Sequence, residues 1–310
     1  MEEFKLYILK KIITIGGIVV LLFFFNYTTD FYGVLSVRKT FVDFTPNERS
    51  LKLDHIINSS SKSKLLFADS RGGIINNDNE FADWYNMSYS MGVPEEFFDD
   101  LVLILNKGRD IKEVVILLDE VSLFEFYKAH EKQVLRKVVN LNSLERFQYL
   151  FLLPNFEVLK ELFRVLSKDL TIEKNIKYDI YDSGSLIESN FLYDFSEIKC
   201  VNRFPEKTNF TTGLTELFDK KLSVLEQIKD FCEKNSIKIT FASQPFSSKY
   251  ILDGFRVSSY FKFLDYAALK EFEIVKPAKC LIFEHNEGQW RDLHHYNSVI
   301  GGLVGKALLN

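Results

Sequence analysis

Two short stretches of the chain carry residue types that together can perform nucleophilic chemistry. Ser70 stands in Ala-Asp-Ser-Arg-Gly-Gly, directly after the apolar run 65–68, and Asp292 and His295 stand near the carboxyl end in the spacing Asp-x-x-His. A serine hydroxyl is inert at neutral pH until a base removes its proton, and histidine, held by a carboxylate, is the usual base. The sequence thus offers a nucleophile, a base and an orienting acid.

Each stretch also has an ordinary structural explanation. Ser70 can be a turn residue after a strand, and Asp292 or Asn297 can cap the helix expected to follow. His294 is a rival to His295 as the base. The chemical interpretation therefore requires the serine and the histidine to meet at one place in the fold.

The elements that would position these residues follow a strand–helix–strand rhythm. The runs 65–68 and 113–118 are uninterrupted and apolar, which is typical of strands buried on both faces, and Pro94 opens an amphipathic helix between them. Such a unit favours a parallel sheet with right-handed crossovers. In open α/β sheets, ligands lie beyond the carboxyl ends of the strands, which is where Ser70 falls. Further elements are expected at 84–89 (strand), 222–232 (helix), 237–242 (strand), 261–272 (helix), 279–283 (strand) and 296–309 (helix).

The middle of the chain, from about 123 to 225, breaks this rhythm, and we interpret it as an insertion that covers one edge of the sheet. Arg71 can bind an anionic substrate or form a structural salt bridge. Trp84, Tyr85 and Tyr89 can stack on sugar rings or pack in the core.

Composition limits the class of protein. Hydrophobic residues make up 46% of the 310 residues and the net charge is −4, which is typical of a globular chain and argues against nucleic-acid binding. The cysteines at 200, 232 and 280 show no metal-ligand spacing, and we expect buried free thiols, with one bridge as the alternative. His285 among acids and His130 in His-Glu-Lys do not form a metal motif. Chemistry at an activated serine needs neither a metal nor an organic cofactor, so none is expected.

An apolar run at 12–25, preceded by Lys5, Lys10 and Lys11, predicts a membrane anchor. A cleaved signal peptide and a buried core helix are the alternatives, but no small-x-small cleavage site follows Phe25 and no charge interrupts the run to give it a solvent face. Lysines on the amino-terminal side put that end in the cytoplasm. We therefore expect a single-pass protein with residues 1–29 as cytoplasmic terminus and anchor, and residues 30–310 as one periplasmic or extracellular domain.

The order of these features resembles the SGNH/GDSL hydrolase family over roughly residues 60–309. Ala-Asp-Ser70-Arg is similar to the Gly-Asp-Ser block with Ala68 in place of glycine, Gly92 matches the second-block glycine, and Asp292 and His295 match the terminal Asp-x-x-His. The third block departs from the family, because Leu-Leu-Asp-Glu replaces Gly-x-Asn-Asp and removes the oxyanion-hole asparagine.

The resemblance implies a three-layer α/β/α flavodoxin-like fold with a parallel sheet, and ester hydrolysis or acyl transfer. Ser70, His295 and Asp292 would be catalytic, and the N–H groups of Ser70 and Gly92 would hold the oxyanion, with Asn86 as a substitute donor. Anchored members of this kind are similar to teichoic acid D-alanylation and alginate acetylation proteins. They imply a cell-surface polysaccharide substrate and a multi-pass membrane O-acyltransferase as partner. Because losing an oxyanion donor costs ~10²–10³ in rate, an inactive member that binds glycan or docks on the acyltransferase is the alternative. A purely structural envelope protein is the third.

Overall fold

A computed structural model describes residues 2–29, 48–75, 81–125, 176–178, 183, 185–188, 199–201, 212–250, 255–277, 280–292 and 295–309. Its centre is a four-stranded sheet in the order β2-β1-β3-β6. The strands are β1 (Lys64–Phe67), β2 (Trp84–Asn86), β3 (Glu113–Leu118) and β6 (Lys238–Ser243). Every neighbouring pair is parallel. The predicted α/β class and parallel sheet are therefore confirmed.

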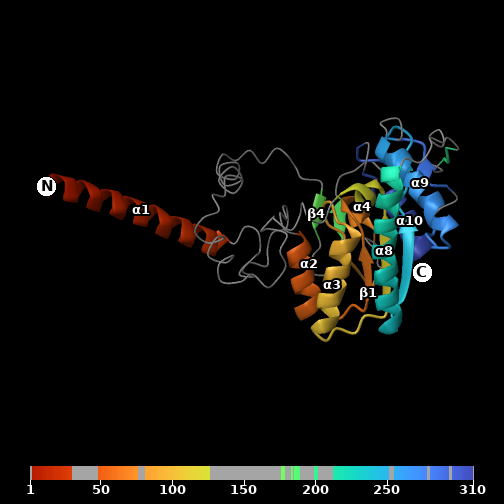
Figure 1. Ribbon diagram of the computed structural model, residues 1–310, viewed down its shortest axis with the longest axis horizontal. Helices are drawn as coiled ribbons and strands as arrows, with labels where there is room; N and C mark the ends of the chain where they lie inside the picture. Colours follow the sequence, from red (N-terminus) through yellow and green to blue (C-terminus); the bar gives the residue numbers. More distant parts are fainter. Residues whose placement is uncertain are drawn as a thin grey trace. The chain divides into compact units, whose positions relative to one another are not determined.

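Helices cover both faces of this sheet (Figure 1). On one face lie α3 (Pro94–Asn106) and α8 (Thr212–Lys234), where the rings of Phe67 and Phe97 are 5.4 Å apart. On the other face α10 (Ser298–Leu308) buries Ile300 and Val304 in one cluster with Leu66. After their first residues, β1 and β3 are buried on both faces, which explains why their sequences are apolar without alternation.

The remaining elements are short or lie around this core. They are α2 (Glu48–Asn58), the 3₁₀ helix η1 (Ser70–Ile74), α4 (Glu120–Phe124), α9 (Phe255–Leu269), an antiparallel pair β4 (Ile176–Tyr178) and β5 (Leu186–Glu188), and a parallel pair β7 (Phe246–Ser247) and β8 (Ile282–Phe283). The helix predicted from residue 222 begins at Thr212, because Leu214 and Phe218 continue its buried stripe.

The amino-terminal helix α1 (Glu2–Thr29) contains a 19-residue segment, Leu6–Phe24, with a mean hydropathy of 2.1. Among the described residues it is the helix long and apolar enough to cross a membrane. The segment predicted to be an anchor thus forms a helix of suitable length and composition.

The chain divides into two compact units, one of residues 1–51 with 131–174 and one of residues 52–130 with 175–310. Most of the insertion predicted at about 123–225 lies outside the described residues, as does 30–47. One described part of it reaches the edge strand β2, where Asn86 N donates to Ser183 O at 2.8 Å.

The cysteine prediction needs correction. Cys200 and Cys280 form a disulfide, whereas Cys232 is free and buried. The segment around Cys200 pairs with β8, since Val201 N donates to Ile282 O at 2.9 Å. This long-range pairing brings together two sulfur atoms that the sequence spacing does not connect.

Candidate active site

Ser70, His295 and Asp292 form a hydrogen-bonded series. Ser70 Oγ lies 3.1 Å from His295 Nε2, and His295 Nδ1 lies 2.8 Å from Asp292 Oδ2. Asp292 Oδ1 also accepts the backbone N–H of His295 at 2.8 Å. Both carboxylate oxygens therefore hold one residue, and an Nδ1–H donated to Asp292 leaves the Nε2 lone pair facing the serine hydroxyl.

Ser70 is the first residue of η1, at the carboxyl end of β1. Asp69 caps this helix by accepting Arg71 N at 2.9 Å with Oδ1, and its carbonyl oxygen accepts Gly72 N at 3.1 Å. An aspartate directly before a turn of helix is a preferred cap because its side chain satisfies an otherwise unpaired N–H. The residue before Ser70 therefore fixes the course of the backbone that carries the hydroxyl.

Backbone pairing fixes the segment that carries His295. Trp290 and Tyr296 form an antiparallel bridge, and Arg291 N donates to His295 O at 2.8 Å. Asn297 then caps α10 by accepting Val299 N at 3.0 Å. The cap is thus Asn297, while Asp292 is used by the histidine. His294 lies outside the described residues.

Two of the predicted oxyanion donors, the Asn86 side chain and the Gly92 N–H, donate to backbone carbonyl groups. The fully buried Asn86 donates its side-chain N–H groups to Gly72 O at 2.8 Å, Gly73 O at 3.3 Å and Ile75 O at 2.6 Å. Its amide therefore holds η1 together and is not directed to an oxyanion. Gly92 N donates to Tyr89 O at 3.1 Å.

Gly92 has a packing role at this point. A Cβ on Gly92 would lie 2.9 Å from Ala68 O and 2.6 Å from the ring of Phe97. Only glycine lets this turn approach the strand end that leads into Ser70. The turn therefore lies against the strand end that leads into Ser70, and the Gly92 N–H predicted to hold an oxyanion donates to Tyr89 O.

A buried ionic network lies next to Ser70. Arg71 is 3% exposed and its guanidinium bonds Asp119, Glu120 (2.6 Å) and, at 3.5 Å, Asp69. Burial lowers the pKa of Arg71, but these carboxylates outweigh it and hold the pKa well above its usual value. The guanidinium carbon also lies 5.1 Å from the centre of the Phe246 ring. Of the two uses predicted for Arg71, the structure has the salt bridge.

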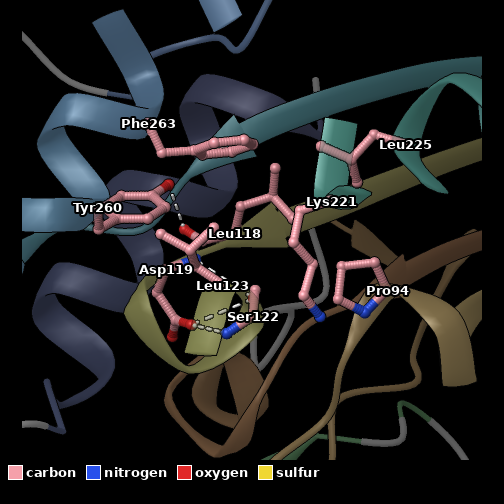
Figure 2. Close-up of a pocket in the computed structure, with 9 residues that line it drawn as sticks. All are labelled: Pro94, Leu118, Asp119, Ser122, Leu123, Lys221, Leu225, Tyr260 and Phe263. Carbon is pink, nitrogen blue, oxygen red and sulfur yellow. Dashed lines mark hydrogen bonds between the residues drawn. The ribbon is translucent and has the colours of Figure 1, made fainter. Parts of the chain in front are cut away.

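Asp119 carries an unusual proton affinity. Burial, with a contribution from the neighbouring Asp69, raises its pKa to about 7 against the lowering effect of Arg71. Its Oδ1 caps α4 by accepting Ser122 N at 2.9 Å. Figure 2 shows this bond beside a cavity of about 10 Å³, room for about one water molecule. Ser70 and His295 are not among the residues that line this cavity.

Aromatic residues offered by the sequence for sugar stacking lie in the core. Trp84, Tyr85 and Tyr89 are at most 2% exposed. Trp84 Nε1 donates to Leu309 O at 3.0 Å, and Tyr89 donates to Asp100 at 3.1 Å. Their rings are therefore not available to a glycan.

His285, which the sequence places among acidic residues, is hydrogen-bonded to a serine. His285 Nδ1 lies 2.8 Å from Ser247 Oγ, and its ring stacks on Trp290. Burial, with a contribution from Lys249, lowers the pKa of His285. Within the described ranges no group of His, Cys, Asp or Glu could hold a metal ion, and His130 lies outside them.

Sequence reasoning missed Gln244 and Tyr296, which contact this network. Gln244 follows β6, at the same edge of the sheet as Asp69 and Asp119, and that shared position was the available signal. Tyr296 directly follows the predicted base.

Comparison with family models, with curated proteins and with solved structures finds no match to this chain.

Proposed function

We propose that this protein is a membrane-anchored serine esterase or O-acyltransferase that acts on acyl esters of a cell-surface or exported polysaccharide. The observation that carries the proposal is the Ser70–His295–Asp292 series, with 3.1 Å and 2.8 Å between its polar atoms. A nucleophile within reach of a base, and a base within reach of an orienting acid, are what covalent acyl chemistry requires.

In the proposed reaction, Ser70 Oγ attacks the acyl carbonyl carbon while its proton moves to His295 Nε2. The tetrahedral intermediate collapses, the bond from the acyl carbon to the polymer oxygen breaks, and His295 returns the proton to that oxygen. A water molecule or an acceptor hydroxyl then gives its proton to His295 and attacks the acyl-serine. The second collapse restores the Ser70 hydroxyl and releases an acid or a new ester. Asp292 stabilises the imidazolium throughout, and no cofactor takes part.

Three further features support a polymer outside the cytoplasm as the substrate. The side chains of His295 and Asp292 are 30% and 51% exposed, so a chain-like substrate can reach them. Lysines on the amino-terminal side of α1 favour a cytoplasmic amino terminus and an outward-facing domain. The Cys200–Cys280 disulfide is typical of an oxidising compartment.

The sheet is compatible with the flavodoxin-like SGNH architecture that the sequence resembles. The order β2-β1-β3-β6 equals the first four positions of the flavodoxin-like order 2-1-3-4-5. Ser70 follows the carboxyl end of β1, where ligands of such sheets bind. In this proposal a multi-pass membrane O-acyltransferase supplies or receives the acyl group.

A second candidate is an inactive member of the same architecture that binds glycan or docks on that acyltransferase. This candidate is favoured because two of the predicted oxyanion donors have other acceptors. The Asn86 amide donates to Gly72 O in η1, and Gly92 N donates to Tyr89 O. Ser70 N–H remains as the donor for an oxyanion, unless Gly92 turns toward the substrate. One missing donor costs ~10²–10³ in rate, so the two candidates differ in turnover.

Labelling with a fluorophosphonate probe separates them. The full-length protein in detergent is expected to label at Ser70, Ser70→Ala is expected to remain unlabelled, and the remote surface variant Ser223→Ala serves as the control that labels normally. Absence of labelling in the unmodified protein, or labelling that persists in Ser70→Ala, would refute the enzymatic proposal. The inactive-partner candidate further predicts that Ser70→Ala leaves surface acylation intact in cells while deletion of α1 abolishes it.

A further inference from the structure

Gln244 joins the two halves of the candidate site through its side-chain amide. Its Nε2 donates to Asp69 Oδ1 at 2.7 Å and to Asp119 Oδ2 at 3.1 Å, and its Oε1 accepts from the Tyr296 hydroxyl at 3.0 Å. Gln244 and Tyr296 are both fully buried. Every hydrogen-bonding group of this amide is thus used where water does not compete.

Two of the three side-chain partners of Gln244, Asp69 and Tyr296, are direct chain neighbours of the reacting residues. Asp69 precedes Ser70 and caps η1. Tyr296 follows His295, whose ring reaches Ser70. A hydrogen-bonded link Asp69–Gln244–Tyr296 therefore connects the two segments that carry Ser70 and His295, which are 225 residues apart in the chain.

The orientation of this amide is set by its surroundings. Asp69 Oδ1 and Asp119 Oδ2 both need hydrogen-bond donors, so the NH₂ group of Gln244 must face them. The amide oxygen of Gln244 then faces the Tyr296 hydroxyl. The backbone of Gln244 is fixed as well, because its N–H donates to Leu118 O at 2.8 Å. The link is therefore rigid at its centre.

We propose that Gln244 and Tyr296 are positioning residues that set the separation of Ser70 Oγ and His295 Nε2. This inference rests on the proposed function. Proton transfer requires the two atoms to remain within hydrogen-bond distance, and a displacement of ~1 Å in an active site can cost about 10²-fold in rate. Nonpolar packing also joins the two segments, because Ile74 of η1 lies in one buried cluster with Tyr296 and Ile300.

The test compares Tyr296→Phe with Tyr260→Phe in the full-length protein. Tyr260 is an equally buried tyrosine whose hydroxyl donates to Leu118 O at 2.8 Å and lies 2.9 Å from Ser243 Oγ. Figure 2 shows that hydroxyl beside Leu118. Both variants lose a buried hydroxyl, so both are expected to lower the urea midpoint of unfolding by similar amounts, and only one interrupts the link.

We expect Tyr296→Phe to lower the rate of fluorophosphonate labelling at Ser70 about tenfold or more, while Tyr260→Phe stays within twofold of the unmodified protein. Adding Gln244→Leu to Tyr296→Phe should reduce the rate less than additively, because both changes interrupt one link. Equal labelling rates for Tyr296→Phe and Tyr260→Phe would overturn the inference.

A second measurement keeps this inference separate from the proposed function. The NMR signals of the His295 ring, assigned with His295→Gln, report its surroundings whether or not the serine reacts. We expect their chemical shifts to change in Tyr296→Phe and not in Tyr260→Phe. An unlabelled protein with that pattern would refute the enzymatic function and retain the link, whereas unchanged chemical shifts in both variants would refute the link.

Discussion

Adding one methyl group at Gly72 should displace η1, the 3₁₀ helix that begins with Ser70, and the structure gives the distances of the resulting contacts. A Cβ on Gly72 would lie 2.3 Å from the Cβ of Ala68 and 2.9 Å from Ser88 Oγ. Carbon atoms in contact prefer ~3.5–4.0 Å, so η1 or the end of β1 must move by about 1 Å. Overpacking of this kind costs ~1–3 kcal/mol, and we expect Gly72→Ala to lose that much stability.

The same contact predicts a rescue. Ala68→Gly alone should cost ~1–2 kcal/mol, because it removes a fully buried methyl group and adds backbone freedom. In the double variant the 2.3 Å contact no longer exists, so its loss of stability should be smaller than the sum of the two by about 1 kcal/mol or more. The difference between the double variant and the sum of the single variants thus measures how closely residue 72 packs against the end of the strand that leads into Ser70.

Urea unfolding followed by tryptophan fluorescence is the suitable assay. The chain has two tryptophans, Trp84 and Trp290, and both are 2% exposed. Gly213→Ala is the control, since no atom lies within 4 Å of the added methyl group and α8 should gain up to ~1 kcal/mol or remain unchanged. A Gly72→Ala variant within ~0.5 kcal/mol of the unmodified protein, or strict additivity in the double variant, would refute the packing argument.

Three further predictions concern the cross-link, the buried acid and the anchor. Cys280→Ser removes the bond to Cys200 and should cost ~2–5 kcal/mol in urea unfolding; an unfolding midpoint equal to that of the oxidised protein would contradict it. Because burial raises the pKa of Asp119 to about 7, the folded protein binds more protons there than the unfolded chain between about pH 4 and 7. Its contribution to stability therefore falls as pH rises through that window, and the unfolding free energy of the protein minus that of Asp119→Asn should decrease from pH 5 to pH 8; a constant difference would argue against the shift. Deleting Leu6–Phe24 should release the protein from carbonate-washed membranes, and a deletion variant that stays in the pellet would exclude this helix as the anchor.

Much of the fold could be predicted because its signals are local. The strand 113–118 was predicted with the observed bounds, and the helix at Pro94 begins where predicted, since proline fits the first turn and the acids after it suit the helix dipole. The last helix was also found. The start of α8 was placed too late, although Leu214 and Phe218 carried the helical period.

The sequence pointed to the serine, the histidine and the aspartate of the candidate site, but not to the hydrogen bonds of the residues around them. Residue types and spacing pointed to Ser70, Asp292 and His295, because activating a hydroxyl requires those types. The engagement of Asn86 with η1 and of Gly92 with Tyr89 could not be read from the chain. A side-chain amide bonds whichever carbonyl groups the packed backbone presents to it, and sequence spacing does not state which those are.

By itself the sequence determined the apolar strands, the amphipathic helices, the apolar amino-terminal helix and the presence of a serine, a histidine and an aspartate suited to acyl chemistry. Tertiary structure decided that Ser70 and His295, 225 residues apart, come within 3.1 Å, that Arg71 is buried among carboxylates, and that Cys200 bonds Cys280. The physical reason is range: backbone propensity and hydrophobic period act over one or two turns of chain, whereas these contacts form only when the strand ends of a packed sheet meet at one edge.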